Sequence, residues 1–277
     1  MSKTIITAAL TGTITPKTAN PHIPCTPAEI AEDAVRVWKE GAAIVHIHVR
    51  DDNEMGCMDP KKFRETVERI RDKTDLVINL TTSGGPTPTD EGRWEHLIEL
   101  KPEMASFDSG TFNWLPGPPF MNTSDFLCKL GKVMIENKVK PEIEVFDTGM
   151  INAAIYFMEK AQVLEMPLHF QFVLGVTGMA KAEPAVVTMM HQMLPAGCTW
   201  SALGIGQGHL PVLLTTLALG GHVRVGLEDN IYYSKGRLAT NSELVMRAAR
   251  LIRENNNEPA TPDEARAILG LRQFNLP

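Results

Sequence analysis

The chain has 277 residues, too many for a minimal domain and about the number that one (β/α)8 barrel requires. Its net charge of −6, without any basic stretch interleaved with aromatic residues, argues against a nucleic-acid partner. Four scattered cysteines, no secretory signal and no apolar run near the ~20 residues of a bilayer span favour a reduced, cytoplasmic protein outside the membrane.

Short β-branched runs alternate with helical patterns along the chain. The predicted strands cover residues 3–9, 43–49, 75–80, 103–107, 142–146, 168–173, 198–203 and 222–226. The predicted helices cover residues 27–40, 60–73, 90–100, 123–137, 149–161, 183–194, 209–219 and 241–254. Eight strand–helix units predict an α/β fold, a single-domain (β/α)8 TIM barrel over residues 1–277. A doubly wound open sheet is the main alternative.

Two histidines close the second predicted strand. His46 and His48 are two residues apart, so in a strand both imidazoles face the same side, with α-carbons roughly 6.5–7 Å apart. Two imidazoles and a third ligand make an open, catalytic type of metal site. A pair of packed core histidines is the alternative interpretation. Polar residues at the ends of the other strands favour the metal site.

Those polar residues lie where TIM barrels place their chemistry, at the carboxyl ends of strands. They include Thr82, Gly84, Gly85, Ser106, Glu144, Arg224, Glu228 and Asp229. Position alone does not choose the third metal ligand. The candidate carboxylates are Glu228, Asp229, Glu144, Asp108 and Asp51. Geometry favours Glu228, because the loop after strand eight lies near strand two of a closed barrel.

A glycine-rich turn follows the seventh predicted strand and opens a helix. Gly204, Gly206 and Gly208 lie in it. Backbone N–H groups at such a turn bind anions, and barrels often bind phosphate after strands seven and eight. The turn is therefore a candidate for holding the phosphates of a nucleotide-like cofactor. A plain tight turn into a helix explains the same residues equally well.

A resemblance to one enzyme family runs along nearly the whole chain. It rests on residues 7–12, 24–31, 41–50, 101–105, 172–175 and 226–230. These segments resemble the β-keto acid cleavage enzymes, whose type member is 3-keto-5-aminohexanoate cleavage enzyme. The resemblance implies a TIM barrel, usually a homotetramer, that takes a β-keto acid and acetyl-CoA and yields acetoacetate and a shortened acyl-CoA.

The resemblance also assigns site residues. It implies one Zn²⁺ per subunit, held by His46, His48 and Glu228. Arg224 and Asp229 match a pair credited in the family with the initial deprotonation. The remaining matches to the family's site are Thr82, Ser106 and Glu144. In this chemistry Arg224 would orient the substrate carboxylate, while Thr82 and Ser106 would donate hydrogen bonds to developing oxyanions.

One residue departs from the family pattern. Ile14 stands where the type member has an acidic residue that resembles a partner for the substrate's amino group. A buried ammonium without a counter-charge is costly, so we expect a β-keto acid with an uncharged tail. Two other functions remain open: a metal-dependent aldolase or hydrolase that uses no CoA, and a metabolite-binding barrel without catalytic activity.

Overall fold

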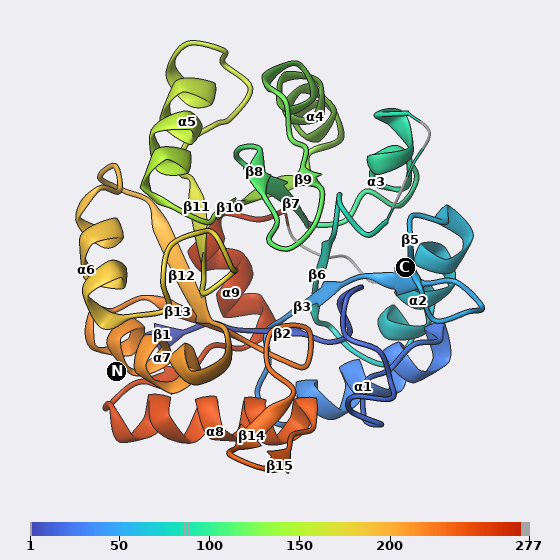
Figure 1. The fold of residues 1–277 in the computed structure, drawn as a ribbon, viewed down its shortest axis with the longest axis vertical. Helices are drawn as coiled ribbons and strands as arrows, with labels where there is room; N and C mark the ends of the chain where they lie inside the picture. The colour runs from blue at the N-terminus through green and yellow to red at the C-terminus, as the bar shows by residue number, and fades with distance from the viewer. Residues whose placement is uncertain (1, 86, 88, 273–277) are drawn as a thin grey trace.

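Eight parallel strands close a barrel in the computed structural model, which describes residues 2–85, 87 and 89–272 (Figure 1). The barrel strands are β2 (Ile6–Ala9), β3 (Ile44–Ile47), β6 (Val77–Leu80), β7 (Met104–Asp108), β10 (Lys140–Val145), β11 (His169–Leu174), β12 (Thr199–Gly204) and β13 (His222–Val225). β13 pairs in parallel with β2 and completes the ring. The closed barrel confirms the predicted fold and excludes the open sheet.

Helices surround the strands (Figure 1). They are α1 (Pro27–Lys39), α2 (Pro60–Arg71), α3 (Glu95–Leu100), α4 (Ser124–Asn137), α5 (Thr148–Glu159), α6 (Pro184–Gln192), α7 (His209–Ala218), α8 (Asn241–Glu254) and α9 (Pro262–Leu269). Thr26 and Thr261 each form a capping box at the start of α1 and α9. Leu269 of α9 packs with Ile44 and Met104, at the starts of two strands, so α9 covers the amino-terminal end of the barrel.

Two predicted elements are interrupted. In the predicted strand 3–9, β1 (Lys3–Thr4) leaves the barrel and pairs with β16 (Glu258–Pro259), while the Ile5 N–H donates to Nδ1 of His222 at 3.1 Å. The predicted helix 90–100 begins as a 3₁₀ turn, η1 (Glu91–Arg93), and α3 starts only after Trp94. A φ of −137° at Trp94 is incompatible with a continuous α-helix.

Three short hairpins that the sequence analysis does not predict follow barrel strands. They are β4 (Val49–Arg50) with β5 (Gly56–Cys57), β8 (Phe112–Asn113) with β9 (Pro119–Phe120), and β14 (Tyr232–Ser234) with β15 (Arg237–Leu238). Strands of two or three residues are too short to leave an alternating pattern. The hairpins extend the loops after β3, β7 and β13, so they build up the carboxyl-terminal mouth of the barrel.

The inner face of the barrel is polar. It carries the buried side chains of Asn79, Ser106, Glu142, His169, Gln171, Ser201 and Arg224. These residues alternate along their strands with apolar core residues such as Ile143 and Phe170, and successive side chains of a strand point to opposite faces. The barrel therefore buries ionisable groups below its mouth. None of the helices in the described part of the chain combines the length and apolarity needed to cross a bilayer.

His169 makes the stability of the fold depend on pH. Its ring is buried, with Nδ1 2.9 Å from the Thr199 hydroxyl, and burial lowers the pKa of His169 to about 3 from 6.5. Below pH 6.5 the His169 imidazole binds a proton in the unfolded chain but not in the folded chain. The free energy of unfolding should therefore fall as the pH falls, by about 1.4 kcal/mol per pH unit from this residue.

Urea unfolding of chelator-treated protein at pH 6.5 and 5.5 measures this contribution. Between pH 6.5 and 5.5, the free energy of unfolding of His169→Asn should fall by about 1 kcal/mol less than that of the wild type. Equal losses in the two proteins would show that His169 does not carry the effect.

Candidate metal centre

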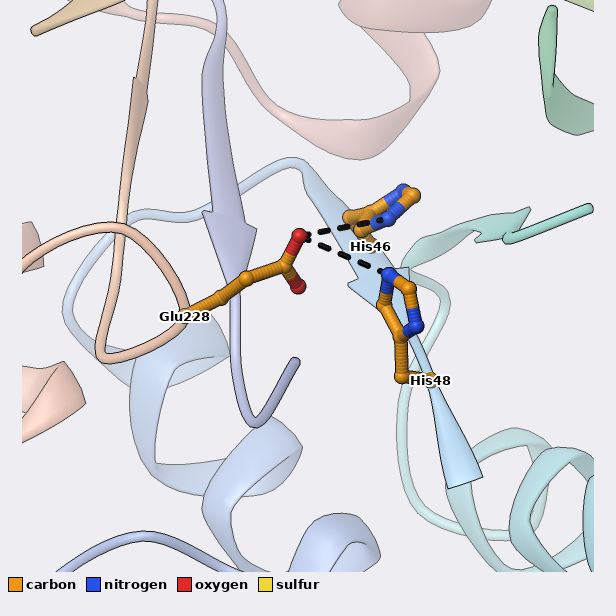
Figure 2. A group of neighbouring side chains, drawn as sticks. All are labelled: His46, His48 and Glu228. Carbon is orange, nitrogen blue, oxygen red and sulfur yellow. Dashed lines mark ion pairs between the residues drawn. The ribbon is translucent and has the colours of Figure 1, made fainter. Parts of the chain in front are cut away.

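Three side chains converge at the mouth of the barrel. His46 is on β3, His48 lies between β3 and β4, and Glu228 lies in the loop after β13. Nε2 of His46 and Nε2 of His48 are 3.7 and 3.5 Å from Oε1 of Glu228. Figure 2 shows both imidazoles facing the same carboxylate. The barrel thus brings together two histidines from one strand segment and Glu228, which lies 180 residues or more away along the chain.

The spacing of these donor atoms fits a metal ion. Ligand atoms about 2.0–2.1 Å from a tetrahedral ion lie about 3.4 Å from one another. The three donors lie within 4.8 Å of one another, and the two histidine–carboxylate distances are longer than ordinary hydrogen bonds. Oε2 of Glu228 is buried and has no hydrogen-bond partner among the described residues. The cluster is therefore better suited to holding a cation than to bonding with itself.

The protonation states of the cluster agree with that interpretation. Burial lowers the pKa of His46 well below its usual range, so its imidazole is neutral at pH 7, the form that binds metal. Burial alone would raise the pKa of Glu228, but the neighbouring His48 ring and the positive charge of Arg224 outweigh it and hold that pKa well below its usual range. A neutral imidazole faces an ionised carboxylate.

A second acid lies on the other side of the His46 ring. Oε2 of Glu142 is 3.8 Å from Nδ1 of His46 and accepts a hydrogen bond of 2.7 Å from the amide of Asn79. His46, Glu142 and Glu144 also form a cluster with metal-ligand spacing. The Arg224 guanidinium lies 2.9 Å from Glu144 and 3.9 Å from Glu142, however, and its positive charge opposes a second cation there.

Arg224 is the centre of the charge network. Its Nε and Nη2 donate to the two oxygens of Asp229 at 3.0 and 3.1 Å. Nη2 also donates to Glu228 at 2.5 Å, and Nη1 donates to Glu144 at 2.9 Å. The bonds of this buried guanidinium go to protein carboxylates. The structure therefore favours Arg224 as the residue that positions Asp229 and Glu228 over the predicted role of orienting a substrate carboxylate.

The two remaining acids have shifted pKa values. Burial raises the pKa of Asp229 to about 6, although Arg224 opposes the shift. Burial, with the nearby carboxyl groups of Asp108 and Glu142, raises the pKa of Glu144 well above its usual range despite Arg224. The raised pKa of Glu144 favours its protonated form, so Glu144 is suited to donating a proton. Asp229 is suited to accepting one.

Thr82 and Ser106, the two predicted hydroxyl donors, are hydrogen-bonded to each other. Thr82 N–H donates to Oγ of Ser106 at 3.0 Å, and the Thr82 hydroxyl donates to the Ser106 carbonyl at 3.1 Å. Both residues are buried. The Thr82 hydroxyl therefore donates to a carbonyl. Oγ of Ser106 accepts from the Thr82 N–H and lies 3.4 Å from the Thr82 hydroxyl, a contact long enough for the Ser106 proton to turn to another group. Ser106 is the better placed of the two as a hydrogen-bond donor.

The predicted glycines lie in two turns. Gly84 donates its N–H to the sulfur of Met58, and Gly85 is packed against the backbone of Gly56, so this turn lies against the β4–β5 hairpin. In the other turn, η2 (Gly206–Gly208), the Gly206 N–H donates to Oδ1 of Asn230 at 2.7 Å.

Further hydrogen bonds, within the second turn and from Asn230, fix its conformation. The Gly208 N–H donates to the Ile205 carbonyl, and the Gly204 carbonyl accepts from Asn230 at 2.9 Å. These internal bonds favour the structural interpretation of the turn over a phosphate cradle made by these N–H groups. Asn230 follows Asp229 directly, so the turn is tied to the loop of the metal centre.

The comparison with known families decides which class of enzyme this is. Residues 3–271 match a protein family described as beta-keto acid cleavage enzyme. The chain belongs to that family. The predicted resemblance is confirmed.

Two characterised relatives of this β-keto acid cleavage enzyme match over nearly their whole length. A "3-keto-5-aminohexanoate cleavage enzyme" of Fusobacterium nucleatum is 45% identical over 275 residues, which are 99% of this chain and 100% of the relative. A "3-oxoadipate:acetyl-CoA acetyltransferase" of Cupriavidus necator is 36% identical over 276 residues, which are 98% of this chain and 96% of the relative. ObcA in complex with oxaloacetate shares the fold, with a TM-score of 0.80, 22% identity and coverage of 91% of this chain and 68% of ObcA.

The predicted site residues of this β-keto acid cleavage enzyme leave out several residues that contact the site. Asn79 and Glu142 lie beside His46, and Arg50 anchors a loop next to Glu228. Polar residues at alternate positions of otherwise apolar strands are a signal that could identify Asn79 and Glu142. Ile14, the predicted substrate contact, lies in the loop after β2 with 68% of its surface exposed.

Proposed function

We propose that this β-keto acid cleavage enzyme uses acetyl-CoA to cleave a β-keto acid, yielding acetoacetate and a shortened acyl-CoA. The observation that carries the proposal is the three-donor cluster of His46, His48 and Glu228 beside the Arg224–Asp229 pair. The relative named 3-oxoadipate:acetyl-CoA acetyltransferase supports acetyl-CoA as the second substrate. Zn²⁺ is the ion that we propose, because two imidazoles and one carboxylate are a common ligand set for catalytic zinc.

The reaction balances without a further reactant. Asp229 takes a proton from C2 of the β-keto acid, and C2 attacks the thioester carbonyl of acetyl-CoA, releasing the CoA thiolate. The thiolate attacks the original ketone carbon, the bond from that carbon to C2 breaks, and C2 regains a proton. The products are acetoacetate and the CoA ester of the shortened acid.

The protein supplies positioning and proton transfer. Arg224 holds Asp229 through two hydrogen bonds, which aims the carboxylate that accepts the C2 proton. The hydroxyl of Ser106 and the carboxyl group of Glu144, whose raised pKa favours the protonated form, are the donors that we propose for the oxyanions that develop during the two attacks. Thr82 fixes the position of Ser106. A bound zinc ion supplies a Lewis acid that polarises the substrate ketone.

We place the outer part of acetyl-CoA beside the glycine turn. A cavity of about 620 Å³ lies at the carboxyl ends of β11 and β12, and its lining includes Met179, Lys181, Ile205, Gln207 and Gly208. It is open, lined by both apolar and polar residues, and tied to the metal-centre loop through Asn230. These features suit a pantetheine arm. Phosphate binding by Gly204, Gly206 and Gly208 stays a prediction, as do the homotetramer, the cytoplasmic location and a single catalytic domain over residues 1–277.

A panel of β-keto acids incubated with acetyl-CoA and zinc tests the proposed function. We expect acetoacetate and a new acyl-CoA, both identified by mass spectrometry, and neither without acetyl-CoA. Cleavage that proceeds equally well without acetyl-CoA would favour the aldolase or hydrolase instead. Binding of β-keto acids without any product across the panel would favour the binding protein.

The prediction of an uncharged substrate tail rests on Ile14, which offers no carboxylate to an ammonium group. Because Ile14 is exposed, water can solvate an ammonium there, so the preference should be smaller than at a buried position. The wild type should turn over a neutral aliphatic β-keto acid with a higher kcat/KM than 3-keto-5-aminohexanoate. Because position 14 is exposed, Ile14→Glu should shift this ratio toward the amino substrate by at most about fivefold, the value of an exposed ion pair. Ile14→Gln, similar in size but uncharged, is the control. An amino substrate preferred by the wild type would refute the prediction.

A further inference from the structure

Arg50 continues the spacing of the two histidines. His46, His48 and Arg50 are at positions i, i+2 and i+4, and Arg50 ends β4. Its side chain is 2% exposed and makes no ion pair with a carboxylate in the portion of the chain that the structure describes. Burying an unpaired guanidinium is costly, and such a group persists only where its hydrogen bonds are well satisfied.

The guanidinium is satisfied by the loop that follows β2. Nε donates to Oγ1 of Thr11 and to the carbonyl of Gly12, both at 3.1 Å. Nη2 donates to the carbonyls of Thr11 and Thr15 at 2.7 and 2.9 Å. Nη1 donates to the carbonyl of Glu54 at 3.1 Å and so ties in the β4–β5 hairpin. One side chain thus fixes residues 11–15, which form no helix or strand of their own.

The loop of residues 11–15 packs against Glu228, the third candidate ligand. Gly12 has a φ of +55°, and a β-carbon built on it would lie 2.7 Å from Cγ and 3.2 Å from Cβ of Glu228. No larger residue fits without displacing the Glu228 side chain. On its other side, Glu228 faces His46 and His48. The position of Glu228 relative to the histidines therefore depends on where the loop holds Gly12.

We propose that Arg50 is a positioning residue of the metal centre. It anchors residues 11–15 so that Gly12 seats Glu228 against the two histidines, an inference that rests on the metal site of the proposed function. Arginine suits this task because its planar fork presents five donors in fixed directions, whereas lysine offers a single flexible ammonium. The same loop carries Ile14, so Arg50 also fixes the position at which we place the substrate tail.

Zinc affinity and loop order test the proposal without relying on turnover. In Arg50→Met, Zn²⁺ should bind about 10- to 100-fold more weakly in a chelator competition assay, the range for residues that orient metal ligands. Backbone amides of residues 11–15 should exchange hydrogen faster than in the wild type when both proteins are metal-free. Arg50→Lys should lie between the two.

Two further variants separate positioning from general destabilisation. Gly12→Ala keeps Arg50 and should weaken zinc binding by displacing Glu228 directly. Arg247→Met is the matched control, because Arg247 is also buried and also ties a hairpin through a carbonyl, that of Tyr233 at 2.7 Å. Its zinc affinity should stay within about twofold of the wild type, a small change beside the expected loss.

The outcomes are distinguishable. A wild-type protein that binds no zinc would overturn the proposed function and this inference together. Wild-type zinc affinity in both Arg50→Met and Gly12→Ala would overturn the inference alone. Equal loss of affinity in Arg247→Met and Arg50→Met would also overturn it, because the effect would then be one of general stability.

Discussion

His46→Ala and Glu228→Gln should each remove zinc from the protein and abolish turnover while the barrel stays folded. The three donors have Nε2–Oε1 separations of 3.5 and 3.7 Å. His46→Ala deletes one of them, and Glu228→Gln replaces the charged carboxylate with a neutral amide oxygen, a much weaker zinc ligand, so only two strong protein ligands remain in either variant. Without the Lewis acid, the rate should fall by about 10³-fold or more, several kcal/mol of transition-state stabilisation. Metal content by mass spectrometry, far-UV circular dichroism and steady-state rates measure the three quantities.

His96→Ala is the control for losing a buried imidazole. His96 is buried, stacks on Phe63 with ring centroids 4.2 Å apart and places Nε2 2.9 Å from the Thr81 carbonyl. Its loss should lower the free energy of unfolding by about 1–3 kcal/mol through the unpaired carbonyl and the cavity. Zinc content should not change. If His46→Ala stays active with full metal content, the ligand assignment is wrong.

The barrel could be predicted because its signals are local. Apolar β-branched runs, helical spacing and the capping boxes at Thr26 and Thr261 each act over a few residues, and eight repeats of them leave few topologies. The breaks at Ile5 and Trp94 could not be predicted in the same way. Ile5 leaves the strand for a bond to His222, 217 residues away, and no local pattern encodes such a partner.

The part of the site that could be predicted from the sequence is the histidine pair, because both residues lie on one strand segment. The two-residue spacing of His46 and His48 predicts a shared direction, and the structure brings both imidazoles to Glu228. Position in the sequence left five carboxylates as candidates for the third ligand. The family resemblance implied Glu228, and closure of the barrel brings that carboxylate to 3.7 and 3.5 Å from the two histidines.

Contacts between distant strands explain what could not be predicted from the sequence. Acids from β10 and from the loop after β13 surround Arg224, and its predicted role in orienting a substrate carboxylate stays a prediction. Glu142 and Asn79 are 63 residues apart and meet only inside the barrel. Arg50 was not among the predicted site residues, because its carbonyl partners Thr11 and Gly12 lie 39 and 38 residues earlier in the chain and come beside it only in the folded barrel.

Asp229→Asn should abolish proton abstraction but leave the metal centre intact. Asparagine has nearly the same shape as aspartate and keeps an oxygen for the Arg224 guanidinium, which donates to both Asp229 oxygens in the wild type. It cannot accept the C2 proton. Removing a general base costs about 10²- to 10⁴-fold in rate, so we expect a loss near 10³-fold with unchanged zinc content.

The exchange of C2 hydrogen in D2O isolates this step, because a β-keto acid can lose and regain its C2 proton on the enzyme before acetyl-CoA is added. Proton NMR should show exchange above the solvent background with the wild type and only background exchange with Asp229→Asn. The control is Glu103→Gln, where another buried carboxylate accepts a hydrogen bond from a buried arginine, Arg266 of α9, at the opposite, amino-terminal end of the barrel. It should exchange C2 hydrogen at the wild-type rate. If Asp229→Asn also does so, another group takes the proton, and Asp229 then serves only to fix Arg224 beside Glu228.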